Sequence, residues 1–83
     1  MTEADAIRSF IIDKLKFRGS HAELTASYPL IDREAIDSMG IFQLIGFIEE
    51  EFGIEVGDSD LVADNFASID AMTKLVERRR LTQ

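Results

Sequence analysis

The residues whose types and spacing best suit chemistry in this sequence are Asp37, Ser38 and Met39. They place one hydroxyl between an acidic and an apolar residue, directly before a strongly apolar run that is typical of a helix. The first turn of that helix would have unpaired backbone N–H groups at the positive end of the helix dipole, where an anionic group is favoured. The Asp37 carboxylate is placed to accept a hydrogen bond from the Gly40 N–H as an N-cap, a contribution of about 1 kcal/mol. The sequence therefore predicts that the Ser38 hydroxyl is the functional group of the protein.

Nucleophilic catalysis finds little support elsewhere in the chain. The sequence contains no cysteine, so it offers neither a thiol nucleophile nor thiolate metal ligands. Ser38 lacks the glycine two positions earlier that a hydrolase nucleophile elbow requires. The single histidine, His21, is expected to be an exposed loop residue. No catalytic residue is therefore predicted.

The spacing of one group of acidic residues is partly similar to that of a calcium-binding loop. Asp58, Asp60 and Asp64 have suitable spacing. However, Ala63 stands where the sharp turn needs glycine, and Ile69 stands where a bidentate glutamate is required. No metal site is predicted.

Length and charge limit the class of protein. With 83 residues the chain suffices for one domain, and residues 1–83 are expected to form a single unit. A formal net charge of -7 disfavours nucleic acid and anionic lipid as partners and favours partners with basic surfaces. No uncharged apolar stretch approaches the roughly 20 residues that cross a bilayer, and the acidic N-terminus does not resemble a secretory signal. A cytoplasmic monomer with no nucleic-acid or membrane partner is expected.

Hydrophobic periodicity predicts an all-α fold, a small bundle of four helices with a long first loop and a short third helix. Thr2 is placed to cap the first helix, which is expected to end near Phe17. The stripe of apolar residues on that helix consists of Ile7, Phe10, Ile11 and Leu15. A long connection then spans residues 19–36, and long loops in small domains usually need anchors. The candidate anchors are Leu30, Ile31 and Ile36.

The second helix is predicted over Ser38–Phe52, with Gly53 just past its end. Its core stripe consists of Ile41, Leu44, Ile45, Ile48 and Phe52, whereas Met39, Phe42 and Phe47 fall partly outside that stripe. A short third helix is expected to open at residues 58–60 and to continue through Val62. The last helix is predicted to begin at Ser68 as N-cap and to end among residues 78–80. The inward residues of the last helix are Ile69, Met72, Leu75 and Val76.

The predicted second helix and its end have the sequence SMGIFQLIGFIEEEFGI, from Ser38 to Ile54. This run resembles the second helix of the acyl and peptidyl carrier proteins, and the long connection before it and the last helix after it extend the resemblance over essentially the whole chain. In that family the serine carries 4'-phosphopantetheine, whose thiol holds a cargo as a thioester. The resemblance therefore implies phosphopantetheine on Ser38, recognition of Asp37 by the phosphopantetheinyl transferase, and no catalysis by the carrier itself.

The resemblance also implies partner enzymes. These are the transferase that installs the arm, a cargo-loading ligase or synthetase, and a downstream transferase. The residues expected to contact partners are Met39, Gly40, Phe42, Gln43 and Glu49. Apolar anchors inside a charged rim are the usual anatomy of a transient docking patch. The acidic residues 49–51 either meet basic partner surfaces or form an ordinary solvated face, and both interpretations stay open.

Departures from the housekeeping fatty-acid carriers indicate a specialised pathway. Those carriers have acidic residues two and five places after the serine, where this chain has Gly40 and Gln43. A serine, an apolar residue and then glycine is similar to the D-alanyl carriers and the stand-alone aminoacyl carriers. The sequence therefore favours a discrete carrier in amino-acid or secondary metabolism. The alternatives are a housekeeping fatty-acid carrier, a non-modified helical interaction module, and a carrier-like domain that has lost its arm.

Overall fold

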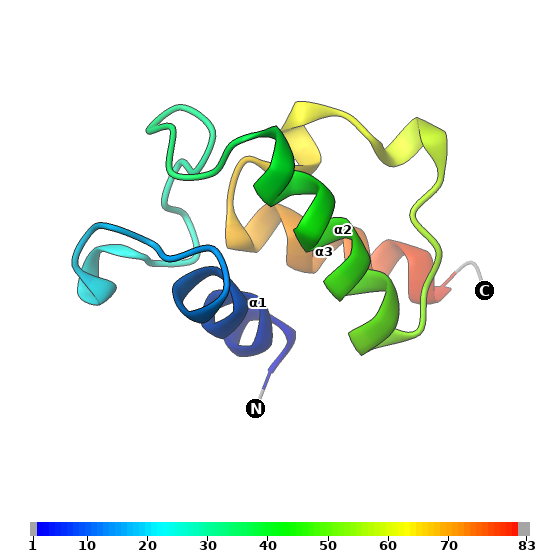
Figure 1. The fold of residues 1–83 in the computed structure, drawn as a ribbon. Coiled ribbons are helices and arrows are strands. Elements are labelled where there is room, and N and C mark those ends of the chain that lie inside the picture. Colours follow the sequence, from blue (N-terminus) through cyan, green and yellow to red (C-terminus); the bar gives the residue numbers. More distant parts are fainter. Residues whose placement is uncertain (1, 82–83) are drawn as a thin grey trace.

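The computed structural model describes residues 2–81, in which α-helices are joined by irregular segments and short 3₁₀ turns (Figure 1). The helices are α1 (Glu3–Asp13), α2 (Ser38–Phe52) and α3 (Ile69–Leu81), and the 3₁₀ segments are η1 (His21–Glu23), η2 (Asp58–Asp60) and η3 (Ala63–Phe66). No β-strand occurs within residues 2–81, so the predicted all-α class is confirmed. In the same part of the chain, no helix combines the length and the apolar character needed to span a membrane.

Helix α1 begins at the predicted cap. The Thr2 hydroxyl accepts a hydrogen bond from the Asp5 N–H at 3.1 Å, and the Asp5 carboxylate accepts one from the Thr2 N–H at 3.2 Å. This reciprocal pair is a capping box, which satisfies two backbone donors that a helix start otherwise leaves free. Ile7 and Ile11 of this helix are fully buried, as predicted.

The end of α1 differs from the prediction. The helix stops at Asp13 rather than near Phe17, and the Lys14 N–H donates to the Phe10 carbonyl at 2.8 Å as the C-cap. Lys16 then adopts a left-handed backbone conformation with φ of 56°. The apolar spacing that suggested a longer helix arises because Leu15 and Phe17 pack against the core from an irregular segment.

Helix α2 has the predicted bounds. Gly53 closes it with a left-handed φ of 64°, and its N–H donates to the Glu49 carbonyl at 3.0 Å. Leu44 and Ile48 are fully buried. Phe47, which was expected to lie partly outside the core stripe, stacks on Phe10 of α1 with ring centroids 4.4 Å apart.

The long loop between α1 and α2 is anchored by apolar side chains. Leu30 is fully buried as predicted, whereas Ile31 and Ile36 are half-buried. Leu24, which the sequence did not single out, is a further anchor at 1% exposure. The Arg8 side chain of α1 supports this anchor, because its Nε donates to the Leu24 carbonyl at 3.0 Å.

Backbone hydrogen bonds tie the same loop to the start of α3. The Leu30 N–H donates to the Ala67 carbonyl at 2.8 Å, and the Asp70 N–H donates to the Ala26 carbonyl at 2.8 Å. These two bonds join segments that are distant in sequence, so the loop is part of the packed domain.

The short third helix is not an α-helix. The chain forms the two 3₁₀ segments η2 and η3 in this region. The Leu61 N–H donates to the Asp58 carbonyl at 3.2 Å, which is the three-residue step of a 3₁₀ turn. Phe66, at the end of η3, is a core residue with 2% exposure that the sequence did not single out.

Helix α3 begins after Ser68, whose hydroxyl accepts a hydrogen bond from the Ala71 N–H at 3.1 Å, as predicted. Arg80, in the last turn of this helix, forms an ion pair with Glu3 of α1 and lies over the Phe52 ring of α2, 5.5 Å from its centroid. The last turn of α3 is therefore linked to both other helices.

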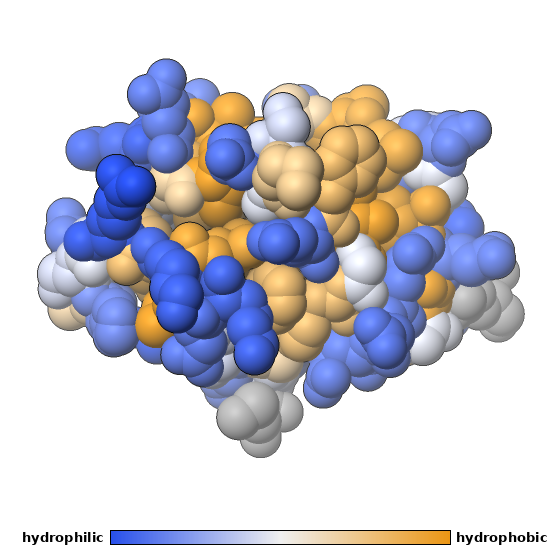
Figure 2. Space-filling model, viewed as in Figure 1, coloured by the Kyte–Doolittle hydropathy of each residue, from blue (hydrophilic) through white to orange (hydrophobic). Residues whose placement is uncertain are grey.

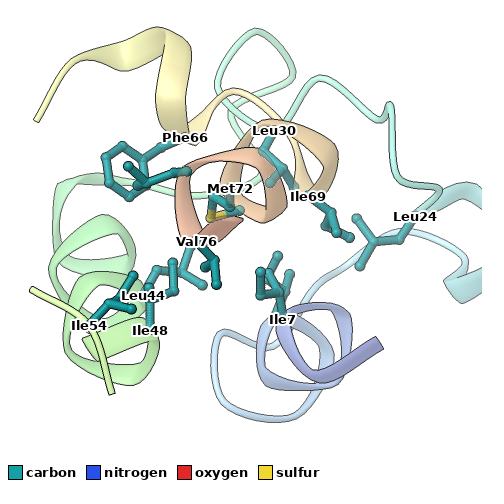
Figure 3. Packing of buried hydrophobic residues seen from close by; sticks show 12 residues of the cluster. Ile7, Leu24, Leu30, Leu44, Ile48, Ile54, Phe66, Ile69, Met72 and Val76 are labelled. Carbon is teal, nitrogen blue, oxygen red and sulfur yellow. The ribbon is translucent and has the colours of Figure 1, made fainter. Parts of the chain in front are cut away.

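The core lies where the three helices and the buried loop anchors meet. Figure 3 shows side chains from α1, α2 and α3 directed into one interior, with Met72 of α3 among them. The buried apolar residues are Ile7, Ile11, Leu24, Leu30, Leu44, Ile48, Ile54, Phe66, Ile69, Met72, Leu75 and Val76. Burying each such side chain contributes about 1.5–3 kcal/mol, and this packing holds α2 in place.

Candidate functional site

Ser38 is the first residue of α2 and is exposed. Asp37 precedes it in an extended conformation, and its Oδ1 accepts a hydrogen bond from the Gly40 N–H at 2.8 Å. The predicted N-cap is therefore confirmed. The cap fixes the start of the helix at the serine, so the hydroxyl is held at a defined position on the surface.

The start of α2 fits a phosphate group. The first N–H groups of a helix have no partner inside the helix. Within residues 2–81, the Gly40 N–H is taken by Asp37, while the N–H groups of Ser38 and Met39 have no protein acceptor. A phosphodiester on the Ser38 oxygen would bring acceptor oxygens next to free donors at the positive end of the dipole.

Two large apolar side chains lie exposed close to Ser38. Met39 is 66% exposed and Phe42 is 69% exposed, whereas Leu44, on the same helix, is fully buried. Gln43 is exposed as well. Hydrophobic residues gather over the first half of α2 on the face shown in Figure 2, and hydrophilic residues surround them. We call Met39 and Phe42 the exposed apolar pair.

Gly40 and Glu49 lie differently from the other residues that were expected to contact partners. Gly40 is buried, and a Cβ there would be 3.4 Å from Ile36 Cβ, so Gly40 offers little surface to a partner. Glu49 is half-buried, and its Oε2 accepts a hydrogen bond from the Val56 N–H at 2.9 Å. This bond fastens the chain that leaves α2. Glu50 and Glu51 are the exposed members of the acidic run.

A hollow that the sequence does not predict lies beside the start of α2. The hollow has a volume of about 600 Å³ and is lined by residues 14–19, by Tyr28 and residues 33–37, and by Met39, Gly40 and Gln43. Its basic residues are Lys14, Lys16, Arg18 and Arg33. We call it the basic hollow. The neighbours of Ser38 on both sides, Asp37 and Met39, lie on its wall.

Comparison with known proteins identifies the family of this chain. Residues 5–76 match the family described as the phosphopantetheine attachment site. This chain belongs to that family.

Two acyl carrier proteins are similar to it. One is the probable acyl carrier protein PigG of a Serratia species, which is 32% identical over 60 residues, covering 72% of this chain and 69% of that protein. The other is an acyl carrier protein of Solidesulfovibrio magneticus, which is 28% identical over 80 residues, covering 96% of this chain and 97% of that protein.

The chain is therefore a carrier protein that presents acyl cargo on a covalently attached 4'-phosphopantetheine arm. Carrier proteins catalyse no reaction themselves. They meet a phosphopantetheinyl transferase and the synthetic enzymes of their pathway. The arm supplies a thiol, and the thiol holds the carboxyl carbon of the cargo as a thioester.

Other polar residues of this carrier protein have structural partners. The Asp60 Oδ2 accepts a hydrogen bond from the Gly57 N–H at 3.1 Å and lies 3.4 Å from the Arg79 Nε. Within residues 2–81, no group of acidic or histidine side chains is arranged to hold a metal ion. His21 is exposed in the long loop, as predicted.

Proposed function

We propose that Ser38 is the residue that carries the phosphopantetheine arm, and that the transferase recognises Asp37 beside it. The main support for this proposal is the position of Ser38. It lies inside the matched region, exposed at the first residue of α2, next to backbone N–H groups without a protein acceptor. Asp37 supports this assignment, because its hydrogen bond to Gly40 fixes the start of the helix.

We further propose one carrier domain over residues 1–83 that works as a monomer in the cytoplasm. In this proposal η2 and η3 take the place of the short helix of a four-helix bundle. The exposed apolar pair and Gln43 dock the enzymes that load and unload the arm, and Glu49 lies at the edge of that surface. A ligase or synthetase would supply the cargo, and a transferase would remove it.

For the pathway, we infer a specialised discrete carrier, closer to the aminoacyl and D-alanyl carriers than to housekeeping fatty-acid carriers. The support is the uncharged surface after the serine, where Gln43 is exposed and Gly40 is buried. A screen of adenylating enzymes against the armed protein tests this inference. Loading only by fatty-acyl or malonyl transferases would contradict it and favour the fatty-acid alternative.

The attachment residue is tested by intact-protein mass after incubation with coenzyme A, magnesium and a broad-specificity phosphopantetheinyl transferase. We expect a single addition of one phosphopantetheine to the wild type and none to Ser38→Ala. The chain supplies a matched control, because Asp58-Ser59 is a second Asp-Ser pair and Ser59 is also exposed. Ser59→Ala should load like the wild type.

Two outcomes would overturn the assignment. Modification of Ser38→Ala would place the arm elsewhere. No modification of a wild type whose helical circular dichroism is intact, with several transferases tried, would favour a helical interaction module or a carrier-like domain without an arm.

A further inference from the structure

The basic hollow lies beside Ser38, the residue proposed to carry the arm. Its volume of about 600 Å³ falls within the roughly 300–1,000 Å³ of small-molecule sites. Asp37 and Met39 lie on its wall, so an arm on Ser38 would start at its rim. Apolar residues, among them Leu15, Phe17 and Ile36, also line it and can pack against methylene groups.

The charge of the hollow is opposite to that of the protein. Four of the nine basic residues of the chain line it, together with the carboxylates of Glu34 and Asp37. The hollow thus has an excess of positive charge in a chain whose formal net charge is -7. Such a local excess attracts anions.

The four basic side chains are not engaged elsewhere. All four are exposed, and within residues 2–81 none has a carboxylate oxygen within ion-pair distance. The basic residues that do form ion pairs, Lys74, Arg79 and Arg80, belong to α3. Arg8, the other basic residue outside α3, donates to the Leu24 and His21 carbonyls. Within residues 2–81, the lysine and arginine side chains with neither a hydrogen bond nor an ion pair are therefore those of the hollow.

A helix dipole does not account for this cluster. Lys14, at the C-cap of α1, complements the negative end of that helix. Arg33, however, comes from the far end of the long loop, and Lys16 lies beyond the end of the helix and itself has a left-handed backbone with φ of 56°. Glu34, with φ of 53°, is the other non-glycine residue in residues 2–81 with a left-handed backbone, and it also lines the hollow. The fold holds two uncommon backbone conformations at this place.

Tethering makes weak binding sufficient here. A group on a flexible linker reaches an effective concentration in the mM range near its anchor. Exposed charge pairs that contribute little in free solution can then keep a tethered group in the hollow for part of the time.

We propose that the basic hollow receives a free carboxylate on the cargo, so that the substrate class is an acyl group with a second carboxylate besides the one in the thioester. This inference rests on attachment of the arm to Ser38. The phosphodiester of the arm is attached at Ser38 and has the same position for every cargo. A second carboxylate on the cargo is at the far end of the flexible arm, so it can move into or out of the hollow. Among the aminoacyl cargoes of the proposed function, the positive charge of the hollow favours an acidic amino acid over alanine, whose thioester has an ammonium group but no free carboxylate. A dicarboxylic acid has the same free carboxylate.

The test compares cargoes of matched length on the full chain. A phosphopantetheinyl transferase attaches arms to the protein from coenzyme A analogues and releases adenosine 3',5'-bisphosphate. The arms carry succinyl, butyryl, aspartyl or 2-aminobutyryl through a stable amide in place of the thioester. Mass spectrometry of the proteolysed protein first establishes that Ser38 carries the arm. Backbone amide shifts of Lys16, Arg18 and Arg33 are then measured by ¹H–¹⁵N NMR against the protein with the unloaded arm.

We expect a carboxylate-bearing cargo to shift these amides and its uncharged or ammonium-only counterpart to leave them unchanged. Shifts with succinyl alone identify dicarboxylic acids as the source, shifts with aspartyl alone identify acidic amino acids, and shifts with both support the shared chemistry. The double variant Lys16→Gln, Arg33→Gln should lose the shifts. The matched control Lys74→Gln, which changes a cation of α3, should keep them.

The inference is wrong if neither carboxylate-bearing cargo shifts these amides beyond its counterpart, or if the shifts persist in the double variant with its fold intact. Failure of the attachment assignment is recognised separately, because it appears in the mass analysis as an arm on another residue or no arm. In that case the proposed cargo site falls with it.

Discussion

At Asp37 a single carboxylate is assigned two roles, and substitution can separate them. Asparagine keeps an oxygen that can accept the Gly40 N–H, and it is as good an N-cap as aspartate, whereas alanine is not. We expect Asp37→Ala to lose about 1 kcal/mol of stability, or about 4–8 °C in Tm for a domain of this size. Asp37→Asn should keep its Tm but lose rate in modification by the transferase. Thermal unfolding and initial loading rates measure the two effects, and wild-type loading of Asp37→Asn would remove the recognition role.

The exposed apolar pair should matter for docking and little for folding. Because Met39 and Phe42 are 66% and 69% exposed, Met39→Ala and Phe42→Glu should each change stability by less than about 0.5 kcal/mol. Both should slow loading of the armed protein by its cognate enzyme. Leu81→Ala changes an apolar residue that is 86% exposed at the end of α3 and is the control. Unchanged loading kinetics for both variants would exclude the pair from the docking surface.

The roles of individual site residues could be predicted only where the residues that interact are close in sequence. Asp37 and Ser38 are neighbours in sequence, so the cap and the position of the hydroxyl were foreseeable. The basic hollow was not, because Arg33 is distant in sequence from Lys14, Lys16 and Arg18 and joins them only through the folding of the long loop. Glu49 looked like part of a solvated acidic run, and its bond to the Val56 N–H depends on how the chain leaves α2.

At the scale of elements, Gly46 within α2 and Gly53 at its C-cap should respond to alanine in opposite ways. A Cβ at Gly46 would meet nothing within 4 Å, so Gly46→Ala should stabilise the domain by about 1 kcal/mol through helix propensity. Gly53 also has open space, but its φ of 64° penalises a side chain, so Gly53→Ala should destabilise it by about 1–2 kcal/mol. Urea unfolding midpoints measure both. A shift in the same direction for the two variants would contradict this account.

The bounds of a helix could be predicted where capping residues mark its ends, and could not be predicted where such residues are missing. Asp37 and Gly53 mark both ends of α2, and its predicted bounds are confirmed. No glycine or proline marks the end of α1 at Asp13, so the apolar residues beyond it predict another helical turn. In the region of η2 and η3, the apolar residues are too few to distinguish an α-helical turn from 3₁₀ segments. The packing of Phe66 into the core depends on tertiary contacts, which the local sequence does not reveal.

At the scale of the whole molecule, the ion pair between Glu3 and Arg80 joins the two ends of the described chain. A hydrogen bond from its own backbone N–H and then the Arg80 guanidinium hold the pKa of Glu3 below its ordinary value of 4.5. A lowered carboxylate pKa adds stability above the unfolded pKa and loses it as the pH falls through the folded pKa.

Glu3→Gln should therefore be less stable than the wild type near neutral pH. The difference should shrink as the pH falls below about 4.5, because the unfolded chain then binds a proton at Glu3 while the folded carboxylate, whose pKa is lower, is protonated only at more acidic pH. Urea unfolding of both proteins at several pH values measures it, and added salt should also reduce it because the pair is partly exposed. A difference that is independent of pH would show that the pair contributes through packing alone.

The backbone hydrogen bonds from Leu30 to Ala67 and from Asp70 to Ala26 have a consequence for motion. They clamp the loop before Ser38 to the start of α3, so this loop opens only when the packed domain opens. The amides of Leu30 and Asp70 should exchange with deuterium far more slowly than loop amides that have no acceptor. The loop that leads to Ser38 is then rigid, so the motion that brings the cargo to several enzymes in turn comes from the prosthetic arm.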